Sequence, residues 1–238
     1  MKTLALMQPY FFPYIGYFML IKHSDAFVLL DDVQYIKDGW IKRNRVLKPS
    51  RDDWQYVTVP VKKFHETARI KDIEIDNSKE WKKKFFAQLA HYKSVSPYYA
   101  EIKDLLEYCL SIETNSINKL NGFILAAVCN YLGITTPISF FSDYSPLDQT
   151  PAYPDEWSLF FCRKHDYDRY INAPGGMSFF RKEQFAASNI ELEFIKPIRC
   201  EYSQKNINFI SELSIIDLLF FNSKEQINGY LEQVEFIN

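Results

Sequence analysis

The stretch that decides the fold runs over residues 4–32, LALMQPYFFPYIGYFMLIKHSDAFVLLDD. It opens with a short apolar run, residues 4–7, which a Gln-Pro pair stops and an aromatic turn follows. Apolar residues then recur with helical spacing over 17–21, and a second fully apolar run covers 26–30. Runs this short suit strands better than helices, so the order is strand, turn, helix, strand. By chirality this β-α-β unit should be right-handed, with its two strands parallel.

Outward from this unit the pattern changes twice. Alternation with period two over 55–61 and 70–75 predicts a β-hairpin or small antiparallel sheet at about 40–76. Helical periodicity then predicts a helical middle section at about 78–133, which ends at Gly133 as a C-cap. Beyond it, strands are expected over 137–141, 169–171 and 192–195, and helices over 157–164, 183–187 and 213–221.

The chain of 238 residues is expected to form a single domain over 1–238. No internal repeat, low-complexity segment or Gly/Ser linker divides it. Strands and helices alternate at both ends, around the helical middle section. This arrangement predicts an α/β fold with a partly parallel, Rossmann-like sheet, flanking helices and a small antiparallel β insertion.

Composition and charge argue against several classes of function. The 28 Lys and Arg against 30 Asp and Glu give a net charge of −2, so no overall field draws the chain to nucleic acid or an anionic membrane. Only 7 glycines are present, and neither G-x-G-x-x-G nor G-x-x-x-x-G-K-[ST] occurs, which disfavours Rossmann-type dinucleotide binding and P-loop chemistry. The 20 Phe, 16 Tyr and 4 Trp supply rings for a core and for stacking on bases or sugars.

Cysteine spacing and the first residues indicate the compartment. The 4 cysteines show no C-x-x-C spacing, and the start of the chain lacks a charged segment followed by a long apolar one. We therefore expect a cytoplasmic protein. No membrane insertion is expected, because no apolar run approaches the roughly 18 residues that a bilayer span needs. The 4 histidines lack the spacing of metal ligands, so no metal site is expected.

Polar side chains follow the predicted strands at the points where the strands end. In an open α/β sheet, ligands bind beyond the carboxyl ends of the strands. The first strand is followed by Gln8, Tyr10 and then Gly16, and the second by Asp31 and Asp32. These groups converge only if their strands are parallel neighbours. The later strands deliver Ser139, Ser142 and Asn172, the last with the Gly175-Gly176 turn.

Three residues are candidates for acid-base catalysis. Asp31 and Asp32 point to opposite sides of an extended chain, so at most one of them faces a site. Such a carboxylate suits a general base that deprotonates an amine or hydroxyl, and it also suits a sugar hydroxyl or a metal ion. A capping or salt-bridged acid is the structural alternative. His23 suits either acid-base chemistry or a plain surface position.

The densest basic stretch is residues 37–46, KDGWIKRNRV. Its arginines present guanidinium forks that fit phosphate, and the neighbouring rings can stack on a base or sugar. The stretch therefore suits a nucleotide diphosphate or a short piece of RNA, and the alternative is a solvated hairpin. The expected binding residues here are Tyr35, Lys37, Trp40, Arg43, Asn44 and Arg45.

A lone acid, Asp217, lies within the apolar helical run over 213–221. Burying it alone would cost several kcal/mol, so it either points outward or is paired. Gln204 lies shortly before this run. The expected set of substrate-binding residues is completed by Gln8, Tyr10, Gly16, Asn172 and Gln204.

Several blocks of this sequence resemble the WbqC-like protein family. The most specific are residues 8–18, QPYFFPYIGYF, residues 25–35, DAFVLLDDVQY, and the Arg-Asn-Arg of residues 43–45. Further similarity lies at 57–61, 131–134, 170–172 with 175–176, and 213–219, so it covers nearly the whole chain.

The resemblance implies a place in bacterial surface-polysaccharide (O-antigen, lipopolysaccharide) gene clusters and the acylation or aminoacylation of an amino sugar. It carries over Gln8, Asp32, Arg43, Asn44 and Asp217 as signature polar positions, without a settled role. The opening turn is also similar in placement to the phosphate-binding turn of class I synthetase-like nucleotidyltransferases. It lacks their paired histidines, which puts adenylyl transfer in doubt.

The expected function is therefore an N-acyltransferase that acts on a nucleotide-linked amino sugar. Asp32, His23 or Asp31 would accept the amine proton, and arginines would hold the diphosphate. The acyl group would come from acyl-CoA, an acyl-carrier protein or an aminoacyl ester, with no covalently bound cofactor. Two alternatives stay open: a protein that binds a sugar nucleotide without transforming it, and a transferase that takes its aminoacyl group from a charged tRNA. The sequence leaves the oligomeric state open.

Overall fold

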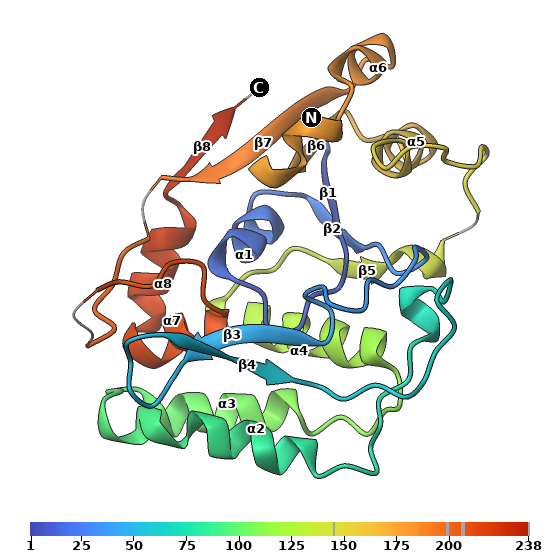
Figure 1. Cartoon of the computed structure of the whole chain (residues 1–238). Helices are drawn as coiled ribbons and strands as arrows, with labels where there is room; N and C mark the ends of the chain where they lie inside the picture. The colour runs from blue at the N-terminus through green and yellow to red at the C-terminus, as the bar shows by residue number, and fades with distance from the viewer. Residues whose placement is uncertain (145, 199, 206–207, 238) are drawn as a thin grey trace.

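The structure, a computed structural model, describes residues 1–144, 146–198, 200–205 and 208–237 (Figure 1). The main sheet has six strands: β1 (Thr3–Met7), β2 (Ala26–Leu29), β5 (Ile138–Phe140), β6 (Arg169–Asn172), β7 (Glu191–Pro197) and β8 (Val234–Ile237). Their order is β5-β2-β1-β6-β7-β8. All neighbouring pairs are parallel except β7 and β8. The predicted, partly parallel α/β sheet is thus confirmed.

Alternate residues along the strands enter two different cores, because successive side chains of a strand point to opposite faces. Ala5 and Ile171 pack in the larger core, whereas Leu4 and Tyr170 pack in the smaller one. The larger core includes α1 (Ile15–Lys22), α4 (Ile117–Leu132), α7 (Ile215–Phe221) and α8 (Lys224–Leu231), and the smaller includes α5 (Glu156–Lys164) and α6 (Lys182–Ala187). The flanking helices predicted from the sequence are present on both faces of the sheet.

A two-stranded antiparallel sheet forms the predicted insertion. It consists of β3 (Arg43–Leu47) and β4 (Trp54–Thr58), with Arg45 opposite Tyr56. Below it in Figure 1 lie α2 (Trp81–Leu89) and α3 (Tyr99–Cys109), which belong to the predicted helical middle section. Contacts join α2 to β4, α3 to α4, and α7 to β3, so the insertion is built into the larger core.

The strand predicted over 70–75 is wrong. Residues Ile70–Asp72 form a short 3-10 helix, and only isolated bridges follow, such as Glu74 with Ser116. Ile70, Ile73 and Ile75 are all buried, but they do not pair with one neighbouring strand. A 3-10 turn brings side chains three residues apart to the same side, which accounts for the burial of Ile70 and Ile73. The last helix and strand, α8 and β8, were not predicted.

The strand order reverses between β1 and β6. From β1 the chain moves outward through β2 to β5, and it then returns to the other side of β1 for β6 and β7. Crossovers that depart to opposite sides leave a crevice at the carboxyl ends of the two central strands. The parallel-neighbour condition for β2, β1 and β6 is therefore met. In the part of the chain that the structure describes, no helix has both the length and the apolar character to cross a membrane.

Candidate functional site

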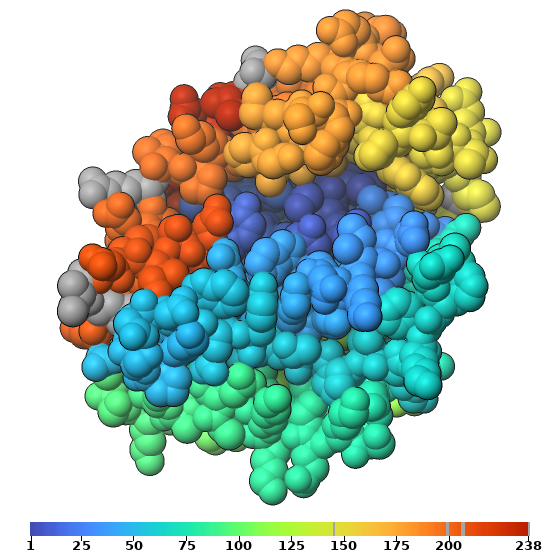
Figure 2. Space-filling view, in the orientation of Figure 1, coloured from blue at the N-terminus to red at the C-terminus, as the bar shows by residue number. Residues whose placement is uncertain are grey.

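A cavity of about 820 Å³ lies at the point where the strand order reverses. Residues from Leu6 to Ile15 form its floor, the segment after β6 forms one wall, and the hairpin with residues 211–213 forms the other. Figure 2 shows this hollow, with its dark-blue N-terminal floor between the orange segment above and the blue segment below. The volume lies in the upper part of the usual range for small-molecule sites, roughly 300–1,000 Å³.

The turn that forms the floor is fixed by side chains from distant parts of the chain. Nδ2 of Asn44 donates to the carbonyl oxygens of Phe11 at 3.1 Å and Phe12 at 2.8 Å. Oγ of Ser214 donates to the same Phe12 oxygen at 2.7 Å. Phe12 has a φ of 41°, in the left-handed region that bulky residues rarely adopt. The floor carbonyls are therefore occupied by protein donors, which hold a strained turn in place.

Gly16 gives room to a ring beside the floor. A Cβ at this position would lie 2.4 Å from Cε2 of the Tyr14 ring, which lines the cavity. Gly16 itself is buried and does not line the cavity. It therefore shapes the site by letting the Tyr14 ring lie against the start of α1.

A cation and an aromatic face meet at one end of the cavity. The guanidinium of Arg45 lies 5.3 Å from the ring centre of Trp40 and 5.4 Å from that of Trp54. Its Nη2 donates to the backbone oxygen of Glu212 at 3.0 Å and lies 3.7 Å from the carboxylate of the same residue. Lys196, at the end of β7, is exposed and also lines the cavity. Arg45 thus offers an anion a positive charge next to a stacking surface, and Lys196 is a second cation of the lining.

Two amides supply hydrogen-bonding groups inside. Asn172, at the end of β6, is 9% exposed, and its Oδ1 accepts the N–H of Ala173 at 2.7 Å. Its Nδ2 has no acceptor among the described residues. The side chain of Gln8 likewise lines the cavity without a hydrogen-bond partner in the described part of the chain. Both amides remain available to a ligand.

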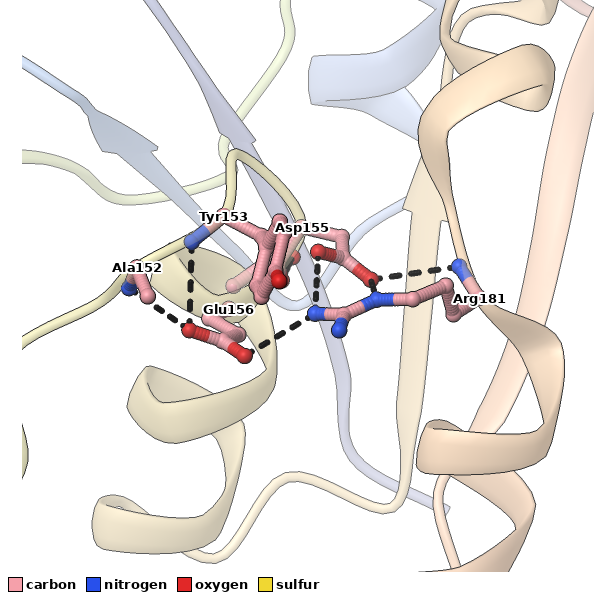
Figure 3. Close-up of polar contacts among 6 residues, drawn as sticks. Ala152, Tyr153, Asp155, Glu156 and Arg181 are labelled. Carbon is pink, nitrogen blue, oxygen red and sulfur yellow. Dashed lines mark hydrogen bonds and ion pairs between the residues drawn. The ribbon is translucent and has the colours of Figure 1, made fainter.

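One wall is held by a clasp between α5 and α6 (Figure 3). Asp155 is fully buried and accepts hydrogen bonds from Arg181 Nε at 2.9 Å and Nη2 at 2.8 Å. The same guanidinium reaches Glu156 Oε1 at 2.9 Å and lies over the ring of Tyr153. Burial acts to raise the pKa of Asp155, but the hydrogen bonds from Arg181 outweigh it, so this pKa lies below its ordinary value. Pro154, beside the clasp, lines the cavity.

The opposite wall contains a buried acid of a different kind. Asp217 in α7 accepts hydrogen bonds from the hydroxyls of Tyr92 at 2.5 Å and Tyr202 at 2.7 Å, and from Gln204 Nε2 at 3.2 Å. Burial raises the pKa of Asp217 to about 6, although these hydrogen bonds act to lower it. Tyr202 lines the cavity, so Asp217 holds a wall residue in position. The prediction that a buried Asp217 must be paired is confirmed.

The structure brings six of the residues expected from the sequence into the cavity lining. They come from the floor, the hairpin and the end of β6, which are far apart in the sequence. Asn44 is committed to the floor turn, and the other five face the cavity without that constraint. The six are Gln8, Tyr10, Trp40, Asn44, Arg45 and Asn172.

The three residues expected to act as acid or base do not line the cavity. Asp31 is fully buried, and its carboxylate accepts from Asn118 Nδ2 at 2.7 Å and from the N–H and hydroxyl of Ser142. His23 ends α1 at the far edge of the sheet, with Nε2 2.9 Å from the backbone oxygen of Leu231.

Asp32 is held by two cations. Its Oδ1 lies 2.7 Å from Arg69 Nη1 and 2.6 Å from Lys71 Nζ. Partial burial acts to raise the pKa of Asp32, but the hydrogen bonds from Lys71 and Arg69 bring it below its ordinary value. A lower pKa makes a weaker base, so the salt-bridged alternative describes the geometry of this acid.

The remaining expected binding residues also lie outside the lining. Gly16 has the packing role described above, and Gln204 holds residue Ile210 through both of its amide atoms. Tyr35 is buried against Phe64, and burial raises its pKa to about 12. Arg43 donates to the backbone oxygen of Asp38 and lies over the Tyr56 ring, and Lys37 is exposed.

Several lining residues were missed, and some of them lie at the end of β7 or after it. The rule applied to the other strands, that ligands bind beyond carboxyl ends, points to Lys196 and Pro197 when it is applied to the strand over 192–195. No sequence pattern distinguishes the residues that come from the loop after them. The missed lining residues include Tyr14, Ser158, Phe179, Lys196, Phe209 and Glu212. Within the described residues, no three His, Cys, Asp or Glu side chains are grouped so as to hold a metal ion.

The sequence model of the WbqC-like protein family matches residues 8–229. The chain is 32% identical over 225 residues to Uncharacterized protein Rv1507c of Mycobacterium tuberculosis (strain ATCC 25618 / H37Rv), a match that covers 92% of this chain and 94% of that protein. No solved structure matches the chain significantly.

Proposed function

The chain belongs to the WbqC-like protein family, and on that premise we propose that it is a transferase that acylates an amino sugar carried on a nucleotide. The acceptor would lie in the cavity at the carboxyl ends of β1 and β6. The family assignment agrees with the sequence blocks that resembled it. The reaction itself rests on the chemistry of the cavity.

The observation that carries the proposal is the placement of Arg45 beside Trp40 in an otherwise largely apolar cavity at the point where the strand order reverses. A guanidinium binds phosphate through paired hydrogen bonds, and an indole ring stacks on a base. Lys196 adds a second positive charge. Gln8 and Asn172 have free amide groups that suit sugar hydroxyls.

The reaction joins the amine to the acyl carbon. The amine nitrogen of the sugar attacks the carbonyl carbon of a thioester, a C–N bond forms, the C–S bond breaks, and the thiol leaves with a proton. The nitrogen loses one proton as the amide forms, and among the described lining residues Glu212 is the carboxylate that would carry this proton from the nitrogen to the leaving sulfur. In this proposal Nδ2 of Asn172, which has no acceptor among the described residues, would donate to the carbonyl oxygen as its negative charge develops.

The test is product formation with purified protein. UDP- and dTDP-linked amino sugars are incubated with acyl-CoA donors, and mass spectrometry looks for the acylated sugar nucleotide. Arg45→Ala should raise KM for the nucleotide sugar about tenfold or more, since a hydrogen bond to a charged group contributes about 1.5–3 kcal/mol. Arg43→Ala is the matched control, because Arg43 lies on the same strand but outside the cavity. Equal effects of the two substitutions, with equal melting temperatures, would contradict the assignment.

A binding protein without turnover is the second candidate. It is favoured by the absence of histidine from the described lining and by the ion pair that engages Glu212. It predicts calorimetric binding of a nucleotide sugar that is weakened by Arg45→Ala, with no product from any acyl donor. Acylated product at catalytic turnover would exclude it.

A further inference from the structure

The charges that line the cavity are unbalanced. Of the described lining residues, three carry charge: the cations Arg45 and Lys196 and the acid Glu212. The side chain of Glu212 is 72% exposed and lies 3.7 Å from Arg45. A positively charged group inside the cavity would therefore find no free carboxylate among the described lining residues, because Glu212 lies towards solvent and is already paired with Arg45.

The buried acids behind the walls are not available to a ligand. Asp155 is engaged by both Nε and Nη2 of Arg181. Asp217 does not line the cavity, and the hydroxyl of the wall residue Tyr202 points to it. Neither carboxylate can reach a ligand without breaking its present hydrogen bonds.

Three backbone carbonyl oxygens at or behind the floor already accept hydrogen bonds from the protein. The carbonyl oxygens of Phe11 and Phe12 accept from Asn44 and Ser214, as described above. The carbonyl oxygen of Leu6 accepts from the Tyr170 hydroxyl at 3.1 Å. Burying an ammonium without a charged partner is strongly unfavourable.

Much of the remaining lining is apolar. The lining includes Ile15, Leu30, Phe180 and Leu218. Phe179 and Phe209, which are 51% and 37% exposed, lie among the lining residues. Such surfaces favour hydrocarbon, and each methylene that becomes buried strengthens binding by about fourfold.

We infer that the group transferred in this cavity is an uncharged acyl group, and that an aminoacyl group with a free ammonium is rejected. The inference rests on the proposed transferase function and specifies its donor. The donor is an acyl thioester: the sugar amine attacks its carbonyl carbon, a C–N bond forms, the C–S bond breaks, and the one proton lost by the nitrogen ends on the sulfur, which leaves as a thiol. A charged aminoacyl ester would place its ammonium in a lining whose described carboxylate, Glu212, is already paired with Arg45.

The experiment compares two donors of nearly equal shape, butyryl-CoA and β-alanyl-CoA, which differ by a terminal methyl in place of an ammonium. With an amino-sugar nucleotide acceptor, kcat/KM for butyryl-CoA should exceed that for β-alanyl-CoA by about 100-fold or more, as expected when a charge is buried without a partner. Equal or reversed preference overturns the inference and leaves the transferase function standing. Absence of amide product from both donors, with every acceptor, overturns the proposed function and the inference with it.

A negative charge introduced into the lining provides a second test of the inference. Ile15 is half-buried at the first position of α1, where an acid is well tolerated at the positive end of the helix dipole. Ile15→Asp should reduce the preference for butyryl-CoA by about tenfold or more, because the new carboxylate can pair with the ammonium. Ile15→Asn introduces a side chain of nearly the same shape as that of Asp but without the charge, so it should leave the preference for butyryl-CoA unchanged. Equal effects of the two substitutions would overturn the electrostatic argument.

Discussion

Two buried acids support opposite walls of the cavity, and they are neutralised in different ways. Asp155 faces the guanidinium of Arg181, so its pKa is lowered. Asp217 faces two hydroxyls and an amide with no cation, so burial raises its pKa to about 6. Asp155 contributes stability at neutral pH that is lost as the pH falls through its lowered pKa. Asp217 contributes stability that is gained as the pH falls through its raised pKa. Equal burial therefore produces opposite responses to pH.

Removing the cation of the clasp should have the largest effect. Arg181→Gln leaves Asp155 fully buried without its charged partner, which we expect to lower the free energy of unfolding by about 3–5 kcal/mol. Urea denaturation measures this change. The double substitution Arg181→Gln with Asp155→Asn should recover a substantial part of it, because no unpaired charge then remains. A double variant as unstable as the single one would contradict the ion-pair explanation.

Replacing the buried acid Asp217 by Asn should abolish its contribution to the pH dependence of the free energy of unfolding. Between pH 4 and 6 folded Asp217 binds a proton that the unfolded chain releases, so wild-type stability rises as the pH falls through this window. Relative to Asp217→Asn, the change between pH 7 and pH 4 should approach about 3 kcal/mol. Urea unfolding of both proteins at several pH values gives the difference. Parallel stability profiles would show that Asp217 does not titrate there.

The floor turn should be sensitive to a single amide. Asn44→Ala removes both donors to the carbonyls of Phe11 and Phe12, and Phe12 keeps only the Ser214 hydroxyl. We expect a loss of about 2 kcal/mol, the cost of leaving a buried carbonyl without a partner. Chemical denaturation measures it. A change below the error of that measurement would mean that Ser214 alone fixes the turn.

An exposed ion pair gives the smallest effect and calibrates the clasp. Lys103 and Glu107 pair across one turn of α3, with side chains 41% and 50% exposed. Lys103→Ala should change stability by less than about 0.5 kcal/mol. If it cost as much as Arg181→Gln, burial would not be the reason for the strength of the clasp.

The sequence predicted the sheet well because its strands are continuous apolar runs. Residues 4–7 and 26–29 pack on both faces of the sheet, and strands buried on both faces are continuous apolar runs. The pattern over 70–75 misled because buried isoleucines alternate there without a neighbouring strand. The start of α8 was readable from Ser223 and Gln226, which form a capping box.

The order of strands in the sequence could predict only those site residues that lie at the carboxyl ends of parallel strands. Gln8 and Asn172 follow parallel neighbouring strands, and the rule about strand ends places both in the cavity. The partners of Asp32 come from Arg69 and Lys71, in a segment whose fold was itself mispredicted. Side chains committed to distant partners cannot be recognised from local spacing.

The floor of the cavity has a consequence for biosynthesis. Its turn, residues 8–14, emerges early, yet its geometry depends on Ser214 and on the N–H of Ile215, which donates to the Pro13 carbonyl. The strand before the turn, β1, also pairs with β6, in which Ile171 lies opposite Ala5. Such contacts close loops of nearly the whole chain, which makes them late and slow steps. A nascent chain on the ribosome therefore carries an unformed site until Ser214 and Ile215 have been synthesised.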